Sequence, residues 1–265
     1  MTSKRFWRLD RALLGILRKG RCSGKCMQKI IGNLTWGMLL NRPLLSVFCA
    51  VYAFSNSERI RQLWGSVRRE LSLIRGLLPF CRRDLRTKAA GVVYASDACG
   101  SGFAVGRADV DLQEVHKLCR VDERWRFRDD AKRGSARSEA LASEELEGPE
   151  VWEKGFRPLP FSVMRDSSWR HMFFSAFSDQ RPIHLKEAHS SIASLKHSLR
   201  CRHSFNRHHL LLSDNMSVCL ALGKGRCADA RLLQYCRRAC ALQVASCSMG
   251  DSMPVPPRRN AAWPT

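Results

Sequence analysis

The spacing of hydrophobic residues changes along the chain, and the changes predict where helices give way to strands. Between residues 30 and 78, apolar residues recur every three or four positions, as on one face of a helix. The residues that set this period are Ile30, Leu34, Met38, Leu44, Val47, Val51, Phe54, Leu63, Val67, Leu71, Ile74 and Leu78. We therefore expect a small helical segment over residues 29–88. Its aromatic residues Trp36, Tyr52 and Trp64 are expected more often in a core than stacked on bases.

After residue 89 the period becomes that of strands. Val92–Ala95 and Phe103–Val105 are short apolar runs on either side of a Gly-Ser-Gly turn, which predicts a β-hairpin. Arg124–Arg128 alternates polar and apolar residues, as a half-exposed third strand would. Phe161–Phe177 is apolar again and predicts a further strand. The run between them, about residues 129–160, is rich in glutamate and is expected to be a surface insertion.

The C-terminal third predicts a helix, a strand and two more helices. One apolar stripe runs along the first helix through Leu185, Ala188, Ile192, Leu195 and Leu199. His208–Ser213 is a continuous run typical of a strand, and Met216–Leu222 and Asp229–Ala245 are expected to be helical. Strands that alternate with helices in this way indicate an α/β protein.

Three acidic residues occupy corresponding places in these elements. Asp97 ends the first strand, Glu187 is expected in the first turn of a helix, and Asp214 ends a later strand. Hard cations such as Mg²⁺ bind carboxylate oxygens, and two ions about 4 Å apart can hold both oxygens of a phosphodiester displacement. The three acids therefore predict a divalent-metal site.

Each acid also has a purely structural interpretation. Asp97 precedes a glycine-rich turn and could be a turn residue. Glu187 could be a helix N-terminal charge favoured by the helix dipole, and Asp214 could cap the helix that follows it. Taken singly these interpretations are favoured, whereas the three acids together favour the metal site.

The charge of the chain indicates a polyanionic partner. Among 265 residues, 45 are Lys or Arg and 24 are Asp or Glu, which gives a net charge of +21. Such an excess favours nucleic acid over an anionic membrane as the partner. The alternative is that the excess of Lys and Arg has no functional role. Residues 1–28 are expected to form a basic helix or arm. Lys224 and Arg226 lie among glycines that would let phosphate approach the backbone, although an ordinary exposed loop fits as well.

The remaining features predict an intracellular protein, in the cytoplasm or the nucleus. No apolar stretch is long enough to span a bilayer, and the N-terminus lacks a signal-peptide pattern. The twelve cysteines form no disulfide framework, so free thiols are expected. A zinc site at Cys22/Cys26 or Cys236/Cys240 has weak support because neither pair has a partner pair at finger-like spacing.

The order of the elements and acids resembles that of the ribonuclease H domain. Several flanking segments are similar to the connection segment and ribonuclease H domain of reverse transcriptases from DIRS-like and related retroelements. These segments are Trp36–Phe48, Val51–Phe54, Leu63–Leu71, Glu123–Arg128 and His208–Val218. The resemblance covers residues 29–265 and implies a mixed five-stranded sheet with helices on both faces, preceded by a helical connection module. No polymerase palm precedes residue 29, so we expect any polymerase domain to be on another chain.

The resemblance also implies a chemistry. Two Mg²⁺ or Mn²⁺ ions would be held by Asp97, Glu187 and Asp214, with Asp97 bridging both, and the RNA strand of an RNA–DNA hybrid would be cut. Asn215 would join Lys224 and Arg226 in contacting the nucleic acid. The family's fourth acid corresponds to Trp263 here, which should weaken the metal that activates water.

Three functions remain open on the sequence. The chain could be a metal-dependent ribonuclease H-type endonuclease. It could be a remnant of a reverse transcriptase polyprotein that binds nucleic acid without cutting it. It could also be a decayed copy of an element with no selected function.

Overall fold

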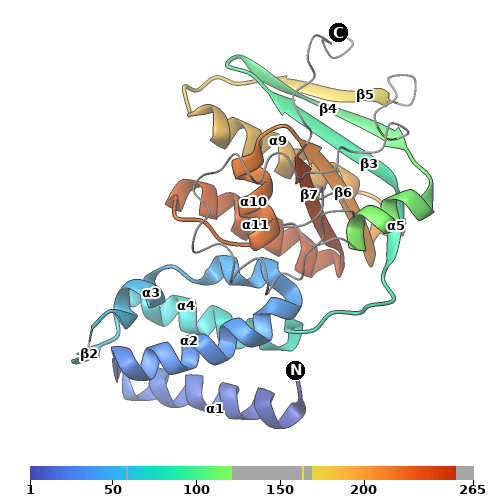
Figure 1. The fold of residues 1–265 in the computed structure, drawn as a ribbon. Coiled ribbons are helices and arrows are strands. Elements are labelled where there is room, and N and C mark those ends of the chain that lie inside the picture. Colours follow the sequence, from blue (N-terminus) through green and yellow to red (C-terminus); the bar gives the residue numbers. More distant parts are fainter. Residues whose placement is uncertain (58, 121–162, 164–168, 255–265) are drawn as a thin grey trace, which may run out of the picture.

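The computed structural model describes residues 1–57, 59–120, 163 and 169–254, which form a helical module and a sheet domain (Figure 1). The predicted strand at Arg124–Arg128, the acidic insertion at about residues 129–160, and Trp263 lie outside the described residues.

The helical module comes first in the chain and closes on itself through a small two-stranded sheet. Strand β1 pairs antiparallel with β2, so the ends of the segment between them lie together. In chain order the elements are α1 (Ser3–Lys19), β1 (Arg21–Ser23), α2 (Gly24–Met38), η1 (Leu39–Val47), α3 (Ala50–Ser55), β2 (Ile60–Gln62), α4 (Gly65–Leu77) and η2 (Leu78–Phe80).

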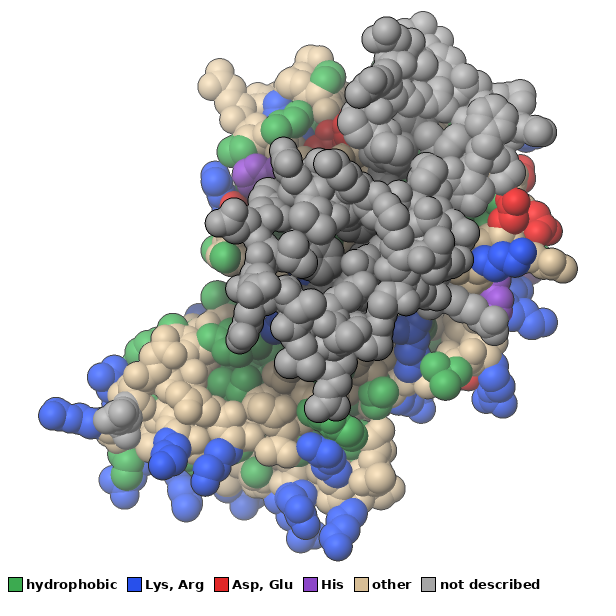
Figure 2. All heavy atoms as spheres, in the orientation of Figure 1, with side chains coloured by type: hydrophobic (Ala, Val, Ile, Leu, Met, Phe, Trp, Pro, Cys, Tyr) green, Lys and Arg blue, Asp and Glu red, His purple; other side chains and the backbone are tan. Residues whose placement is uncertain are grey.

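Helix α1 belongs to the core of this module. Leu9, Leu13 and Ile16 are buried in one cluster with residues of α2, α3 and α4. Of residues 1–28, expected as a basic helix or arm, Ser3–Lys19 form a helix packed on its neighbours, and β1 and the start of α2 follow it. Figure 2 shows many Lys and Arg side chains on the visible face of the helical module.

The prediction that the three aromatic residues lie in the core was wrong. Trp36, Tyr52 and Trp64 are 56%, 37% and 43% exposed. The aliphatic residues of the three-and-four period fill the core instead. Trp36 lies beneath the Arg5 guanidinium, whose carbon is 4.0 Å from the ring centroid.

The sheet domain contains a mixed five-stranded sheet in the order β5-β4-β3-β6-β7. Strand β4 runs antiparallel to β3 and β5, whereas β6 is parallel to β3 and β7 is parallel to β6. The strands are β3 (Lys88–Ala98), β4 (Gly102–Asp109), β5 (Trp169–Ala176), β6 (Arg207–Ser213) and β7 (Met249–Pro254). This order and these directions are those of a ribonuclease H-like sheet, so the predicted fold class is confirmed.

Helices cover both faces of the sheet. Alternate residues of β6 point to opposite faces, as the two-residue period of a strand requires. Leu211 packs in the cluster with α9, α10 and α11, and Leu210 and Leu212 pack in the cluster with α5. The bounds are α5 (Leu112–Arg120), α9 (Ile183–Ser198), the short η6 (Arg202–Ser204), α10 (Met216–Lys224) and α11 (Ala230–Ser246).

Helix α11 joins the sheet domain to the helical module. The Arg237 guanidinium donates to the carbonyl oxygens of Ser46 and Val47, at 3.0 and 3.2 Å, and lies 3.5 Å from the Glu70 carboxylate. Glu70 in turn accepts hydrogen bonds from the three backbone N–H groups that begin α3 (Cys49, Ala50 and Val51). A single buried carboxylate therefore satisfies a helix N-terminus and an arginine across the junction.

The structure places none of the twelve cysteines in a disulfide bond. Within the described ranges, no helix combines the length and the apolar character needed to cross a membrane.

Candidate metal centre

Asp97 and Asp214 lie level with each other across two parallel strands. In the β3–β6 ladder Ala95 is the partner of Leu212, and each acid comes two residues later. Neighbouring strands are about 4.8 Å apart, so this register brings the two carboxylates to one edge of the sheet. Asp97 is inside β3 and pairs with Ala104 of β4, so the alternative that it is a turn residue was wrong.

Helix α9 brings Glu187 to the same edge by packing closely on β3. Small side chains permit the approach: Ser191 of α9 and Ser96 of β3 lie with their hydroxyl oxygens 3.4 Å apart. Glu187 Oε1 then accepts a hydrogen bond from the backbone N–H of Ala98 at 3.2 Å. The first-turn placement of Glu187 was wrong, because α9 begins at Ile183 after Pro182 and has no acid in its first turn. The helix-dipole interpretation of Glu187 therefore fails.

Lys186 fastens the neighbouring turn to α9. Its side chain is almost fully buried, its ammonium donates to the carbonyl oxygen of Gly100, and it lies 5.1 Å from the centroid of the Phe177 ring. The β3–β4 turn that follows Asp97 is thus tied to the helix that carries Glu187. The sequence pattern gave no indication of this contact, because Lys186 falls outside the apolar stripe of the helix, where a lysine normally faces solvent.

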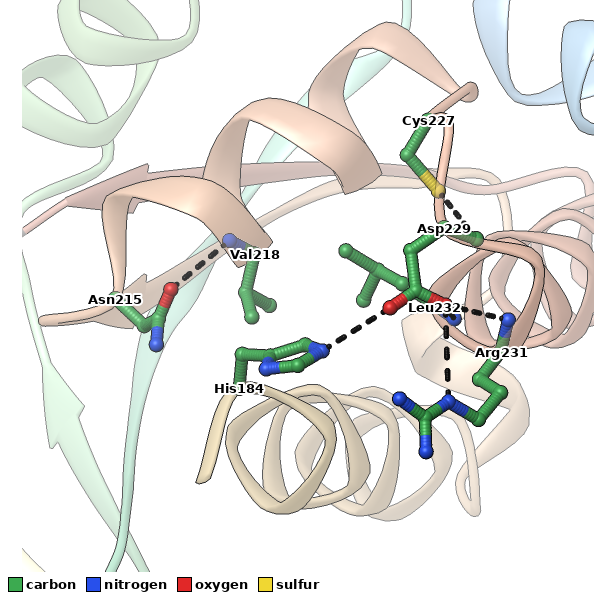
Figure 3. A network of polar contacts seen from close by, with 7 residues as sticks. All are labelled: His184, Asn215, Val218, Cys227, Asp229, Arg231 and Leu232. Carbon is green, nitrogen blue, oxygen red and sulfur yellow. Dashed lines mark hydrogen bonds and ion pairs between the residues drawn. The ribbon is translucent and has the colours of Figure 1, made fainter. Parts of the chain in front are cut away.

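Side-chain caps define the starts of α10 and α11 (Figure 3). Asn215 Oδ1 accepts from the backbone N–H of Val218 at 3.2 Å and so caps α10. The cap of α10 is therefore Asn215, and the alternative that Asp214 is the cap was wrong. Asp229 caps α11 and also lies 3.3 Å from His184 Nε2, which links the starts of α11 and α9.

The three acids form one group. One carboxylate oxygen from each of Asp97, Glu187 and Asp214 lies within 4.8 Å of the others. Asp97 is half-buried, Glu187 is 3% exposed, and Asp214 is exposed. Burial, followed by the charges of Asp214 and Asp97, raises the pKa of Glu187 to about 8. Partial desolvation of the Asp214 carboxyl group and the charge of Asp97 also raise the pKa of Asp214.

A divalent cation fits this group. Glu187 Oε2 is buried and has no hydrogen-bond partner among the described residues, although a buried polar atom is normally paired. Carboxylates that approach one another at a partly buried position raise each other's pKa, and a cation removes that penalty. Hard oxygen ligands of this kind suit Mg²⁺, Mn²⁺ or Ca²⁺. Among the described residues the group holds three carboxylates and no fourth.

The predicted phosphate contacts lie farther along α10. Lys224 is the last residue of that helix and Arg226 follows it, so both are at the opposite end from Asp214. The glycine between them, Gly225, has a φ of +63°, and a Cβ there would overlap the backbone of Arg42. A glycine is therefore needed at this position because the helical module packs closely on the end of α10.

No family model matches the chain, and no curated protein sequence matches it. Among solved structures, a foamy viral protease-reverse transcriptase in complex with RNA/DNA hybrid matches with 10% identity and a TM-score of 0.26. The match covers 96% of this chain and 48% of that one, so this chain spans about half its length.

Proposed function

We propose that the protein is a metal-dependent endonuclease that cuts the RNA strand of RNA–DNA hybrids. The observation that carries the proposal is the convergence of Asp97, Glu187 and Asp214 at one edge of a ribonuclease H-like sheet. A single acid can have a purely structural role. Here Asp97 is not in a turn, Glu187 is not in the first turn of a helix, and Asp214 is not the cap of α10.

Each residue has a distinct part in this proposal. Asp97 and Asp214 present carboxylates from adjacent parallel strands, and Glu187 supplies a buried carboxylate held by Ala98. Divalent ions held by these carboxylates would activate water and neutralise charge on the leaving 3′-oxygen. The raised pKa of Glu187 makes ion binding compete with a proton, so activity should fall as the pH drops below about 8.

Charge supports a nucleic-acid substrate. The net charge of +21 favours a polyanion, and contacts to phosphates place a duplex without reading its sequence. In this proposal Lys224 and Arg226 contact phosphates of the nucleic acid. Asn215 lies next to the site but is not assigned a nucleic-acid contact here, because its amide oxygen already caps α10.

The test is cleavage of an RNA–DNA hybrid labelled on the RNA strand, in Mg²⁺ and in Mn²⁺. We expect the wild-type protein to cut the RNA, and Asp97→Asn to reduce the rate by at least about 100-fold, as loss of electrostatic stabilisation does. Asp109→Asn is the matched control, because Asp109 pairs with Val92 at the far end of the hairpin. Equal cleavage by Asp97→Asn and the wild type would contradict the assignment.

The alternative function is binding without cleavage. It is favoured by the three-carboxylate set, since the family's fourth acid is matched to Trp263 in the sequence. It predicts hybrid binding whose affinity falls steeply with salt, with no cleavage in either metal. Cleavage that is lost in Asp97→Asn excludes it.

A further inference from the structure

A second group of metal-ligating side chains lies at the other end of the sheet. His208 is the second residue of β6, whereas Asp214 follows its last residue, so the two sites are about 20 Å apart along the strand. Asp251 comes from β7, which pairs with β6, and Cys119 comes from the end of α5. The topology thus unites three residues that are far apart in the sequence.

The ligand atoms of Cys119, His208 and Asp251 lie nearly as close together as the ligands of a metal ion. His208 Nε2 lies 2.9 Å from Asp251 Oδ2, and one ligand atom from each of Cys119, His208 and Asp251 lies within 4.8 Å of the others. Tetrahedral zinc with ordinary bond lengths separates its ligand atoms by about 3.3 to 3.6 Å. Shifts of a few tenths of an ångström to about 1 Å would therefore admit the ion.

The ligand types select the metal. Thiolate and imidazole are ligands for Zn²⁺ and similar transition metals, whereas Mg²⁺ and Ca²⁺ prefer all-oxygen sites. Cys119 and His208 are each 7% exposed, and Asp251 is partly exposed. Zn²⁺ with one thiolate, one carboxylate and one neutral imidazole has no net charge, so its burial carries little desolvation cost.

A cavity gives the group access to solvent. All three residues line a cavity of about 990 Å³, whose wall also includes Asn41 and Arg42 of the helical module. Three protein ligands with solvent access leave the fourth position of a tetrahedral zinc site for water.

We propose that Cys119, His208 and Asp251 bind one Zn²⁺ ion, separately from the carboxylate centre. Binding releases the proton of the Cys119 thiol to solvent and replaces the His208–Asp251 contact with bonds from both side chains to the metal. The ion would join the end of α5 to β6 and β7. This site is independent of the proposed nuclease activity, and its test does not use hybrid cleavage.

The experiment is a Co²⁺ titration of the chelator-treated full chain, followed by absorption. We expect a thiolate-to-cobalt band in the near ultraviolet that saturates at one equivalent and disappears when Zn²⁺ is added. Cys119→Ser should remove the band, and His208→Gln should weaken binding by more than about tenfold. Cys247→Ser is the matched control, because Cys247 lines the same cavity but is outside the group. Asp97→Asn should leave the band unchanged.

Persistence of the band in Cys119→Ser, or its absence from the wild type, would overturn the proposal. If Cys119→Ser does not fold, alkylation of the wild-type protein, mapped by mass spectrometry, decides the question. We expect Zn²⁺ to protect Cys119 from iodoacetamide and to leave Cys247 reactive. Equal reactivity of Cys119 with and without Zn²⁺ would also overturn it.

Discussion

Glu187→Gln should stabilise the metal-free protein at high pH. Burial and the neighbouring acids raise the pKa of Glu187 from its ordinary value of 4.5 to about 8. Below pH 4.5 the group is protonated in both the folded and unfolded states and contributes nothing. As the pH rises from 4.5 to about 8, the unfolded chain loses this proton while the folded protein keeps it, so stability falls. Above pH 8 the whole cost is present.

The size of this effect follows from the pKa. One pKa unit corresponds to about 1.4 kcal/mol, so a pKa of about 8 in place of 4.5 corresponds to at most about 5 kcal/mol. Local rearrangement lowers the cost, and we expect Glu187→Gln to gain about 2 to 5 kcal/mol at pH 9. Glutamine keeps an oxygen for the Ala98 N–H and removes the charge.

The assay is urea unfolding at several pH values, in EDTA and in Mg²⁺. The gain should be near zero at pH 4 and largest at pH 9 in EDTA. In Mg²⁺ it should shrink, because ion binding stabilises the wild type by about 1.4 kcal/mol at tenfold excess over Kd. Asp109→Asn, an exposed control, should change stability by less than about 1 kcal/mol at any pH. A Glu187→Gln protein that is no more stable than the wild type at pH 9 would refute the reasoning.

Three further predictions concern the framework of the site, each measured by urea unfolding. Glu70→Ala should cost about 3 to 5 kcal/mol, since it removes a buried acceptor of three N–H groups and the carboxylate partner of Arg237; a loss below 1 kcal/mol would contradict the role. Gly225→Ala should cost at least about 2 kcal/mol because of its positive φ and the overlap with Arg42, whereas Gly76→Ala, with open space around it, should not destabilise. Asn215→Ala should cost about 1 kcal/mol through loss of the α10 cap; unchanged stability with weaker hybrid binding would favour the nucleic-acid contact instead.

The sheet and two of the acids were predictable because strands leave a simple pattern. The run His208–Ser213 is hydrophobic on both faces, as a strand between two helical layers must be, and the observed strand is Arg207–Ser213. Asp97 and Asp214 stand out because each interrupts such a run at its end. Their level positions follow from the parallel register, which no local pattern contains.

Helix α9 shows what the hydrophobic period missed. Ser190, Ser191 and Ser194 are buried because the helix lies close against β3, yet small polar residues add nothing to an apolar stripe. The helix begins at Ile183, which puts Glu187 beyond its first turn. Proline and isoleucine at residues 182 and 183 are not typical capping residues, so the sequence did not mark this start. The same burial raises the pKa of Glu187, so this chemical property also depended on tertiary structure.

The group of Cys119, His208 and Asp251 had no signature in the sequence. Short spacing rules search for ligands on one segment, and these three come from α5, β6 and β7. Only the strand order places them together. The burial of helix α1, by contrast, did have a pattern in the sequence. Leu9, Leu13 and Ile16 recur at helical spacing, but the surrounding basic residues obscured it.

The most direct test of the carboxylate centre is anomalous X-ray scattering from crystals of the protein grown or soaked with Mn²⁺. The account predicts a manganese peak within about 2.2 Å of oxygens from Asp97, Glu187 and Asp214, and no such peak in Asp97→Asn crystals. Well-ordered carboxylates with no manganese peak between them, at saturating Mn²⁺ and pH 8, would contradict the central claim.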